Sequence, residues 1–289
     1  MNDLDELITE AGGAANVDYE LRPTSELVAL INAQDSTVAD AVGAAAGAIA
    51  AAIDLIVERL ATGGRLVYVG AGTSGALAEL DAEECVNTFS APAGQVLAVR
   101  AASEGAEDDA DGGAAAISAA AVSSKDAVVG ISASGRTPYV LGALRAAADA
   151  GAPTIALVCV ADPELGQLVD HVIPVVVGPE FIAGSTRLKA GTAQKLVLNS
   201  ISTIAMVRRG KTFGNLMVDV AARNEKLRAR VHRIVRTATG ASPDDVDEVL
   251  DAAGGEAKVA IVSLLGRIDA ETARARLHDA NGNIRLAIS

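Results

Sequence analysis

Two segments rich in glycine and hydroxyl side chains carry the residues best suited to binding a small anion. Gly70–Gly75 follows the apolar run Leu66–Val69, and Ser132–Thr137 follows the apolar run Ala127–Ile131. Glycine lets an anion approach bare backbone N–H groups, and a helix that begins directly afterwards adds unpaired N–H groups and a favourable dipole. For either loop alone, a tight turn without a ligand is the alternative. The predicted phosphate-binding residues are Thr73, Ser74, Ser132, Ser134, Gly135 and Thr137.

The first loop differs from the two best-known nucleotide-binding loops. Thr73 and Ser74 stand inside its glycine pattern, and no acidic residue ends a second strand at the position that binds ribose in dinucleotide-binding folds. A P-loop would require Gly-Lys-Ser or Gly-Lys-Thr, which does not follow here. The ligand expected from this loop is therefore a phosphate group outside those two nucleotide-binding classes.

Apolar runs that alternate with helical patterns predict the elements that position these loops. Such alternation implies a parallel sheet of about five strands with helices on both faces, and ligands bind at the carboxyl ends of the strands. A helix over 35–61 precedes the sheet, and another runs from about 184 to 206 after it. The predicted strands are 66–69, 95–99, 127–131, 154–160 and 171–177.

The rest of the chain divides near Gly240. Residues 1–23 are polar and irregular, and Ser242-Pro243 begins a small region of three predicted helices, with Ser242 as the N-cap. We therefore expect a domain over 1–240, with an N-terminal helical arm, and a small helical subdomain over 241–289.

Composition excludes several classes of function. The chain has 289 residues, half of them apolar, with a formal net charge of -13, which argues against binding nucleic acid or an anionic membrane. Cys85 and Cys159 are the two cysteines, too few for a disulfide framework or a cysteine-rich zinc site. The acidic N-terminus lacks the features of a signal peptide. These features predict a soluble, cytoplasmic protein.

Four cations could supply positive charge to an anionic substrate. Arg136 lies in the second loop, while Arg187, Lys189 and Lys195 lie near the start of the predicted helix after the sheet. A solvated helix face explains any one of the last three equally well.

The chain resembles a known enzyme family in five long motifs. Its loops resemble the paired serine and threonine loops of the sugar isomerase (SIS) domain, and the full set is similar to the N-acetylmuramic acid 6-phosphate etherases. The resemblance covers nearly the whole chain in the same order, with departures at Ala76, Ala78, Glu83 and Val86-Asn87. The motifs are 70–75, 104–108, 132–139, 184–195 and 214–220.

The resemblance implies a fold and an activity. The fold is an SIS-type three-layer α/β/α domain with a five-stranded parallel sheet and a small helical C-terminal subdomain. The family cleaves the lactyl ether of N-acetylmuramic acid 6-phosphate to N-acetylglucosamine 6-phosphate and D-lactate in the recycling of cell-wall sugar. Its members are cytoplasmic homodimers that need no metal or cofactor. The family's acid corresponds to Glu84, before Cys85, and its second functional glutamate to Glu107.

The chemistry of ether elimination also calls for two carboxyl groups such as those of Glu84 and Glu107. Eliminating an ether β to an aldehyde requires a base that removes the proton at C2 and an acid that protonates the departing lactate oxygen. We assign Glu84 as the acid and Glu107 as the base. In a continuous helix Glu84 shares a stripe with Leu77, Leu80 and Asp81, so we expect burial to raise its pKa.

Two other functions compete with the lyase. A non-catalytic sensor could bind a sugar phosphate in the same pocket, and retention of both glutamates argues against it. A sugar-phosphate isomerase would need a base, and His171 and His232 are more often structural at such positions. Cys85 is a poor nucleophile because no histidine motif accompanies it.

Overall fold

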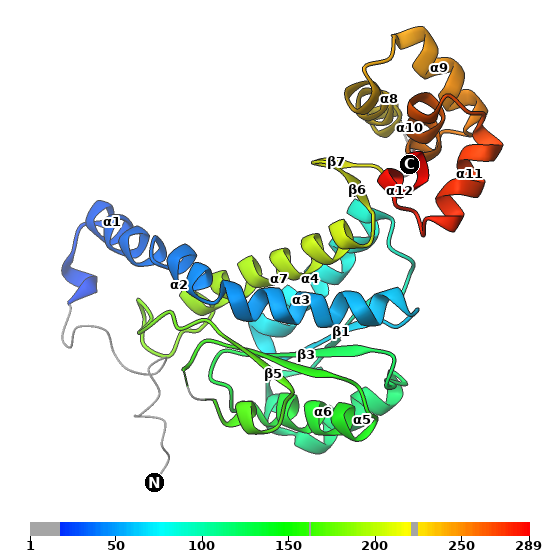
Figure 1. The fold of residues 1–289 in the computed structure, drawn as a ribbon. Coiled ribbons are helices and arrows are strands. Elements are labelled where there is room, and N and C mark those ends of the chain that lie inside the picture. The colour runs from blue at the N-terminus through cyan, green and yellow to red at the C-terminus, as the bar shows by residue number, and fades with distance from the viewer. Residues whose placement is uncertain (1–17, 162, 221–224) are drawn as a thin grey trace. The chain divides into compact units, whose positions relative to one another are not determined.

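The computed structural model describes residues 18–161, 163–220 and 225–289 (Figure 1). It divides the chain into two compact units. The first contains Gly94–Ser202 and the described residues before Glu83, and the second contains Glu83–Ala93 and Thr203–Ser289. The division therefore falls near Thr203, whereas the sequence predicted a boundary near Gly240. Of the segment 1–23, which was predicted to be irregular, residues 1–17 lie outside the described residues.

Among the described residues, three helices precede the sheet where the sequence predicted one. A short 3₁₀ turn, η2 (Tyr19–Leu21), leads into α1 (Thr24–Asp35), α2 (Val38–Ala44) and α3 (Ala46–Ala61). The predicted helix over 35–61 is wrong at its start and is interrupted at Ala45, which has φ -88° and ψ 4°. The chain bends by 58° at that break. Gly43 and Gly47 stand on either side of Ala45, and glycine lowers the cost of leaving the helix there.

Five parallel strands form the sheet of the first unit, in the order β2-β1-β3-β4-β5. The predicted strands are confirmed, although β4 and β5 end earlier than expected. Tyr68 of β1 is paired with Ala98 of β2 and with Val129 of β3, which fixes the register. The strands are β1 (Leu66–Gly70), β2 (Val96–Arg100), β3 (Ala127–Ser132), β4 (Thr154–Val158) and β5 (His171–Pro174).

Helices cover both faces of this sheet. Figure 1 shows α3 across one face and the pair α5 (Ala110–Ala119) and α6 (Pro138–Asp149) across the other. A Cβ atom on Gly113 would lie 2.0 Å from the Tyr139 carbonyl oxygen, and one on Gly142 would lie 1.9 Å from that of Ala110. These two glycines therefore permit the close approach of α5 and α6. The predicted three-layer α/β/α domain is confirmed.

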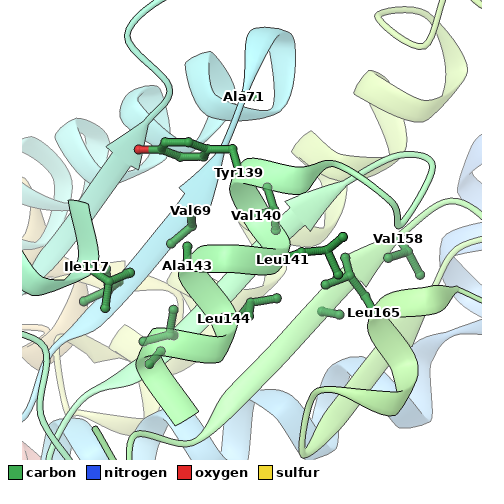
Figure 2. Close-up of a cluster of buried hydrophobic side chains, with 14 of the residues drawn as sticks. Val69, Ala71, Ile117, Tyr139, Val140, Leu141, Ala143, Leu144, Val158 and Leu165 are labelled. Atoms are coloured by element: carbon green, nitrogen blue, oxygen red, sulfur yellow. The ribbon is translucent and has the colours of Figure 1, made fainter. Parts of the chain in front are cut away.

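The core beneath α6 consists of branched aliphatic side chains, alanines and Tyr139 (Figure 2). Val69 of β1 and Val158 of β4 gather with Val140 and Leu144 of α6, and all four are fully buried. Burying a side chain of this size stabilises the fold by about 1.5–3 kcal/mol. The apolar runs that identified the strands therefore also anchor the strand ends from which the polar loops leave.

An ion pair joins the amino ends of β1 and β3, at the edge opposite those loops. Arg65 Nη2 lies 2.8 Å from Asp126 Oδ2, and Arg65 Nε donates to Oδ1 at 3.0 Å. The backbone N–H groups of Arg65 and Ser123 donate to the same carboxylate. Burial alone would raise the pKa of Asp126, but the bonds from Arg65 and Ser123 outweigh it and hold the pKa below its ordinary value.

Replacing Asp126 by asparagine should lower the free energy of unfolding by about 2 kcal/mol at neutral pH, because Arg65 then loses its buried counter-charge. A depressed pKa contributes stability that is complete above the unfolded-state pKa and is lost as the pH falls through the folded-state pKa. Urea unfolding at neutral pH and below pH 3.8 measures both effects. The gap between the two proteins should narrow in acid, and a gap independent of pH would contradict this account.

The second unit is helical apart from one small hairpin. Gly214 and Asn215 form the turn between β6 (Thr212–Phe213) and β7 (Leu216–Met217). Ser242 accepts a hydrogen bond from the Asp245 N–H and caps α9, as predicted. Residues 241–289, all of them described, contain four helices, so the prediction of three is wrong. Besides the ends of α4 (Gly72–Phe89) and α7 (Lys189–Arg208), the helices of the unit are α8 (Glu225–Thr239), α9 (Pro243–Ala252), α10 (Ala257–Gly266), α11 (Ala270–Asp279) and α12 (Ile284–Ile288).

No single helix in the described parts of the chain is both long enough and apolar enough to cross a membrane.

Candidate functional site

Both hydroxyl-rich loops leave the same edge of the sheet at neighbouring strands. Gly70 at the end of β1 is paired with Ile131 of β3. From β1 the chain passes to β2 on one side and then returns to β3 on the other, so the direction of winding changes between β1 and β3. Ligands of open parallel sheets bind outside the carboxyl ends of the strands at such a switch point. The predicted location of the two loops is confirmed.

The first loop turns directly from β1 into α4 (Gly72–Phe89). A Cβ atom on Gly70 would lie 2.8 Å from the Gly75 nitrogen, and one on Gly75 would lie 2.8 Å from the Gly70 carbonyl oxygen. Only glycine at both positions therefore keeps the turn this tight. Thr73 is exposed and Ser74 is half-buried in the first turn of α4. Their hydroxyls and the unpaired N–H groups of that turn are the donors that an anion needs.

In the second loop, Ser132 is the central hydrogen-bonding residue. Its side chain is buried, its Oγ lies 2.8 Å from Thr137 Oγ1, and it accepts a bond of 3.1 Å from the Gly135 N–H. Ser134 Oγ lies 3.5 Å from Ser132 Oγ and accepts from the Arg136 N–H. The three predicted hydroxyls therefore form one cluster, in which Ser132 orders the loop and Ser134 and Thr137 remain partly exposed.

Gly135 makes the shape of this loop possible. Its φ of +69° lies in the left-handed region, and a Cβ atom there would lie 2.6 Å from Pro163 Cβ. Pro138 then starts α6 at its first position. Arg136 beside Gly135 is exposed.

The segment that carries Glu107 leaves the end of the adjacent strand β2. The Ala101 N–H donates to the Gly70 carbonyl oxygen at 3.1 Å, which holds this segment against the end of β1. The 3₁₀ helix η3 (Glu104–Asp108) follows, and the Glu107 side chain is half-buried. Three neighbouring strands, β2, β1 and β3, thus supply polar residues to one edge.

Glu84 lies in α4, as expected, but the predicted burial of its carboxyl is wrong. Glu84 is exposed and Leu80 is 42% exposed, while Asp81 on the same stripe is 2% exposed. Tyr68 and Ser202 each donate to the Asp81 carboxylate at 3.0 Å. The helical stripe therefore buries Asp81, whose carboxylate is hydrogen-bonded, and leaves Glu84 exposed.

The cations near α7 (Lys189–Arg208) differ in position. Lys189 is 6% exposed and its Nζ donates to the Val177 carbonyl oxygen at 2.8 Å, which argues against the substrate contact predicted from its charge. Glu180 accepts bonds of 2.9 Å from the N–H groups of Lys189 and Ala190, so the helix begins at Lys189 and not near Gly184.

Arg187 and Lys195 line a groove of about 320 Å³. Thr73 and Leu77, from the start of α4, line the same groove. Arg187 is exposed, whereas Lys195 Nζ lies 4.0 Å from Asp81 Oδ1. These two cations stand beside the first phosphate loop.

A glutamine that the sequence analysis overlooked also contacts the first loop. Ser74 Oγ donates to Gln194 Oε1 at 2.9 Å, and Gln194 is 1% exposed. Gln194 lies within the motif 184–195, but its residue type alone does not assign it a role.

His171, His232 and Cys159 lie in surroundings that are typical of structural residues. His171 Nε2 lies 2.7 Å from the Ala48 carbonyl oxygen, and His232 Nδ1 lies 2.7 Å from Asp247 Oδ1 in the second unit. Burial, and then Glu180, raise the pKa of the Cys159 thiol to about 12, so it stays protonated. These positions favour the structural interpretation of both histidines.

Known families and folds match this architecture. The glucokinase regulatory protein N-terminal SIS domain matches residues 48–148, and the SIS domain matches residues 109–203. A phosphoheptose isomerase from Neisseria gonorrhoeae aligns with a TM-score of 0.50 at 21% identity, covering 63% of this chain and 98% of that chain. One from Francisella tularensis has a TM-score of 0.50 at 22% identity, covering 62% and 98%. These similarities establish the SIS fold.

Full-length relatives are more similar. A protein of Rubrobacter xylanophilus is 53% identical over 99% of this chain and 97% of its own. Relatives from Streptomyces avermitilis and Mycolicibacterium smegmatis are 49% and 47% identical over 99% of this chain, and over 95% and 99% of their own. All three are named N-acetylmuramic acid 6-phosphate etherase. With this identity over nearly its whole length, the chain belongs to the N-acetylmuramic acid 6-phosphate etherase family.

Proposed function

We propose that the protein is a lyase that cleaves the D-lactyl ether of N-acetylmuramic acid 6-phosphate. The products are N-acetylglucosamine 6-phosphate and D-lactate, in the recycling of cell-wall amino sugar. The observation that carries the proposal is the meeting of two hydroxyl-rich loops at the β1/β3 switch point, in a chain that is 53% identical to a named etherase. Phosphoheptose isomerases share the fold. The loops therefore support the binding of a phosphate group, and membership of the family supports cleavage of the ether.

The phosphate at C6 of the sugar is bound at the two loops. Ser134 and Thr137 are partly exposed at the second loop, and Thr73 and Ser74 stand at the start of α4. Ser132 and Gly135 shape the second loop. Arg136 and Arg187 are exposed cations that can add positive charge to the site, which a chain of net charge -13 needs locally. Lys189 is left out of this assignment because its side chain is buried and its ammonium group donates to the Val177 carbonyl oxygen.

The two glutamates divide the chemistry of elimination. In the ring-opened aldehyde the carboxylate of Glu107 removes the proton at C2, and the electron pair forms the C2–C3 double bond as the C3–O bond breaks. Glu84 protonates the departing lactate oxygen. Water then adds at C3, a proton returns to C2, and the ring closes. No covalent intermediate on the protein is needed.

We also propose that the protein is a cytoplasmic homodimer. Helix α1 has no buried residue, although it contains Leu27, Val28, Leu30 and Ile31, and Val28 is 60% exposed. Apolar side chains on an exposed helix favour a covering partner, and a second copy is the one expected. Light scattering in solution measures the mass, and a single-chain mass would contradict the dimer.

Turnover in water enriched in oxygen-18 tests the reaction. Elimination followed by hydration leaves the ether oxygen in lactate, so lactate should be unlabelled and the heavy atom should appear at C3 of the sugar. The aldehyde oxygen at C1 also exchanges with water, and a later incubation in ordinary water removes that label but not the one at C3. Labelled lactate would instead indicate hydrolysis at the lactyl carbon and contradict elimination.

A sugar-phosphate sensor is the second candidate, because a sensor needs only to bind the ligand and the two phosphate loops are sufficient for binding. Binding of N-acetylmuramic acid 6-phosphate without lactate release would support the sensor. A sugar-phosphate isomerase is less favoured, since His171 is bonded to Ala48 and His232 lies beside Asp247 in the second unit.

A further inference from the structure

Gln194 has a buried side-chain amide whose oxygen accepts a hydrogen bond and whose nitrogen, within the described part of the chain, has no partner. Its Oε1 accepts the Ser74 hydroxyl at 2.9 Å, and the residue is 1% exposed. An amide nitrogen buried without a partner costs free energy, so its position needs an explanation.

The same contact limits what Ser74 can do. A serine hydroxyl has one hydrogen, and here that hydrogen points to Gln194. Ser74 therefore cannot donate to a phosphate at the start of α4 while this bond persists. The Ser74 hydroxyl thus donates to Gln194, while the Nε2 group of the same glutamine has no hydrogen-bond partner within the described part of the chain.

We propose that Gln194 is a positioning residue that exchanges its hydrogen-bonding role with Ser74 when a phosphate binds. The amide turns by half a rotation, Nε2 donates to Ser74 Oγ, and the Ser74 hydrogen is donated to a phosphate oxygen. This inference rests on the proposed function, because it assumes that the first loop binds the phosphate. Gln194 itself does not touch the ligand, since its Nε2 is shielded from solvent.

The surroundings of Gln194 suit such an exchange. The oxygen and the NH2 group of an amide are nearly equal in size, so the half rotation needs no additional space. The helix that carries Gln194 is held on both sides of it: Glu180 accepts from the Ala190 N–H, and Ser202 donates to Asp81. The backbone therefore stays in place while the amide turns. The ligand-bound arrangement contains one hydrogen bond more between the amide, the serine and the phosphate.

A double-mutant cycle on binding tests the proposal. The variants are Gln194→Met, Ser74→Ala and the two combined, and calorimetry measures the Kd for N-acetylglucosamine 6-phosphate. We expect Gln194→Met alone to weaken binding about fivefold to tenfold, because Ser74 Oγ then lacks the donor that orients its hydroxyl towards the phosphate. In the Ser74→Ala background the same substitution should change the Kd little, because Gln194 acts through Ser74.

Gln34→Met in α1 is the matched control, since this glutamine also has a buried amide atom without a partner. It should bind as the wild type does. If Gln194→Met fails to fold, Gln194→Glu keeps the shape and the bond to Ser74 but cannot donate when ionised. Its loss of affinity should then be larger with Ser74 present than in the Ser74→Ala background.

An equal loss in both backgrounds, or no loss with Ser74 present, would overturn the role of Gln194 while the wild type still binds the sugar phosphate. Failure of the wild type to bind it would overturn the proposed function, and the role of Gln194 with it.

Discussion

Replacing Glu84 by glutamine should slow lactate release by about 10²-fold to 10⁴-fold, the usual contribution of a general acid. Glutamine has nearly the same size and cannot give a proton to the departing lactate oxygen. The phosphate loops are not changed, so the Kd for N-acetylglucosamine 6-phosphate should stay close to that of the wild type. Lactate release and calorimetric binding measure the two quantities separately.

The adjacent Glu83 supplies the control. It is exposed in the same helix and carries the same charge, so Glu83→Gln tests whether losing any carboxylate here slows the reaction. We expect Glu83→Gln to retain most of the activity. In heavy water, Glu84→Gln should still exchange the C2 hydrogen of the sugar, because the assigned base, Glu107, is intact. Wild-type turnover by Glu84→Gln would contradict the assignment of Glu84 as the acid.

The exposure of Glu84 bears on how this acid works. An acid is useful near neutral pH when its surroundings disfavour the ionised form. The sequence predicted such surroundings from a helical stripe, but the stripe buries Asp81 and leaves Glu84 exposed. Helical spacing fixes which residues share a face, and tertiary packing decides where along that face burial ends. The helical stripe alone therefore does not supply the buried surroundings that the sequence predicted for Glu84.

Most of the first unit could be predicted because its signals are local. The strands are continuous apolar runs, and Gly70 and Gly75 occupy positions where a Cβ atom would collide with backbone. The order of the strands places Gly70–Gly75 and Ser132–Thr137 side by side without any long-range information beyond the crossover rule.

The predictions are weakest where contacts between residues far apart in sequence decide the structure. The ammonium group of Lys189 is buried and donates to the Val177 carbonyl oxygen, twelve residues earlier, which argues against the predicted substrate contact. Glu180 fixes the start of α7 at Lys189 from outside the helix. Residues 184–188, which the sequence predicted to be helical, therefore precede the helix. Ala45 is a strong helix former that nevertheless stands at a break. Gln194 lies within the motif 184–195, but its contact with Ser74 joins residues 120 positions apart and could not be predicted from that motif.

Replacing Ser132 and Ser134 together by alanine should weaken binding of N-acetylglucosamine 6-phosphate by about 10²-fold or more, because two hydroxyls near a charged group are lost. Ser132→Ala should account for the larger part. Its hydroxyl accepts from the Gly135 N–H and bonds Thr137, so its loss also disorders the donors around it. Ser134→Ala removes a partly exposed hydroxyl and should have the smaller effect.

The exposed Ser118 on α5 is the control, since its hydroxyl donates to the Ala114 carbonyl oxygen within its own helix. Ser118→Ala should bind the sugar phosphate normally. Because Ser132 is buried beneath the loop, thermal unfolding of each variant separates a lost ligand contact from a lost fold. An unchanged Kd in the double variant would remove the second loop from the phosphate site and leave only the start of α4. A loss shared equally by Ser132 and Ser134 would instead mean that both hydroxyls contact the phosphate and that Ser132 has no special ordering role.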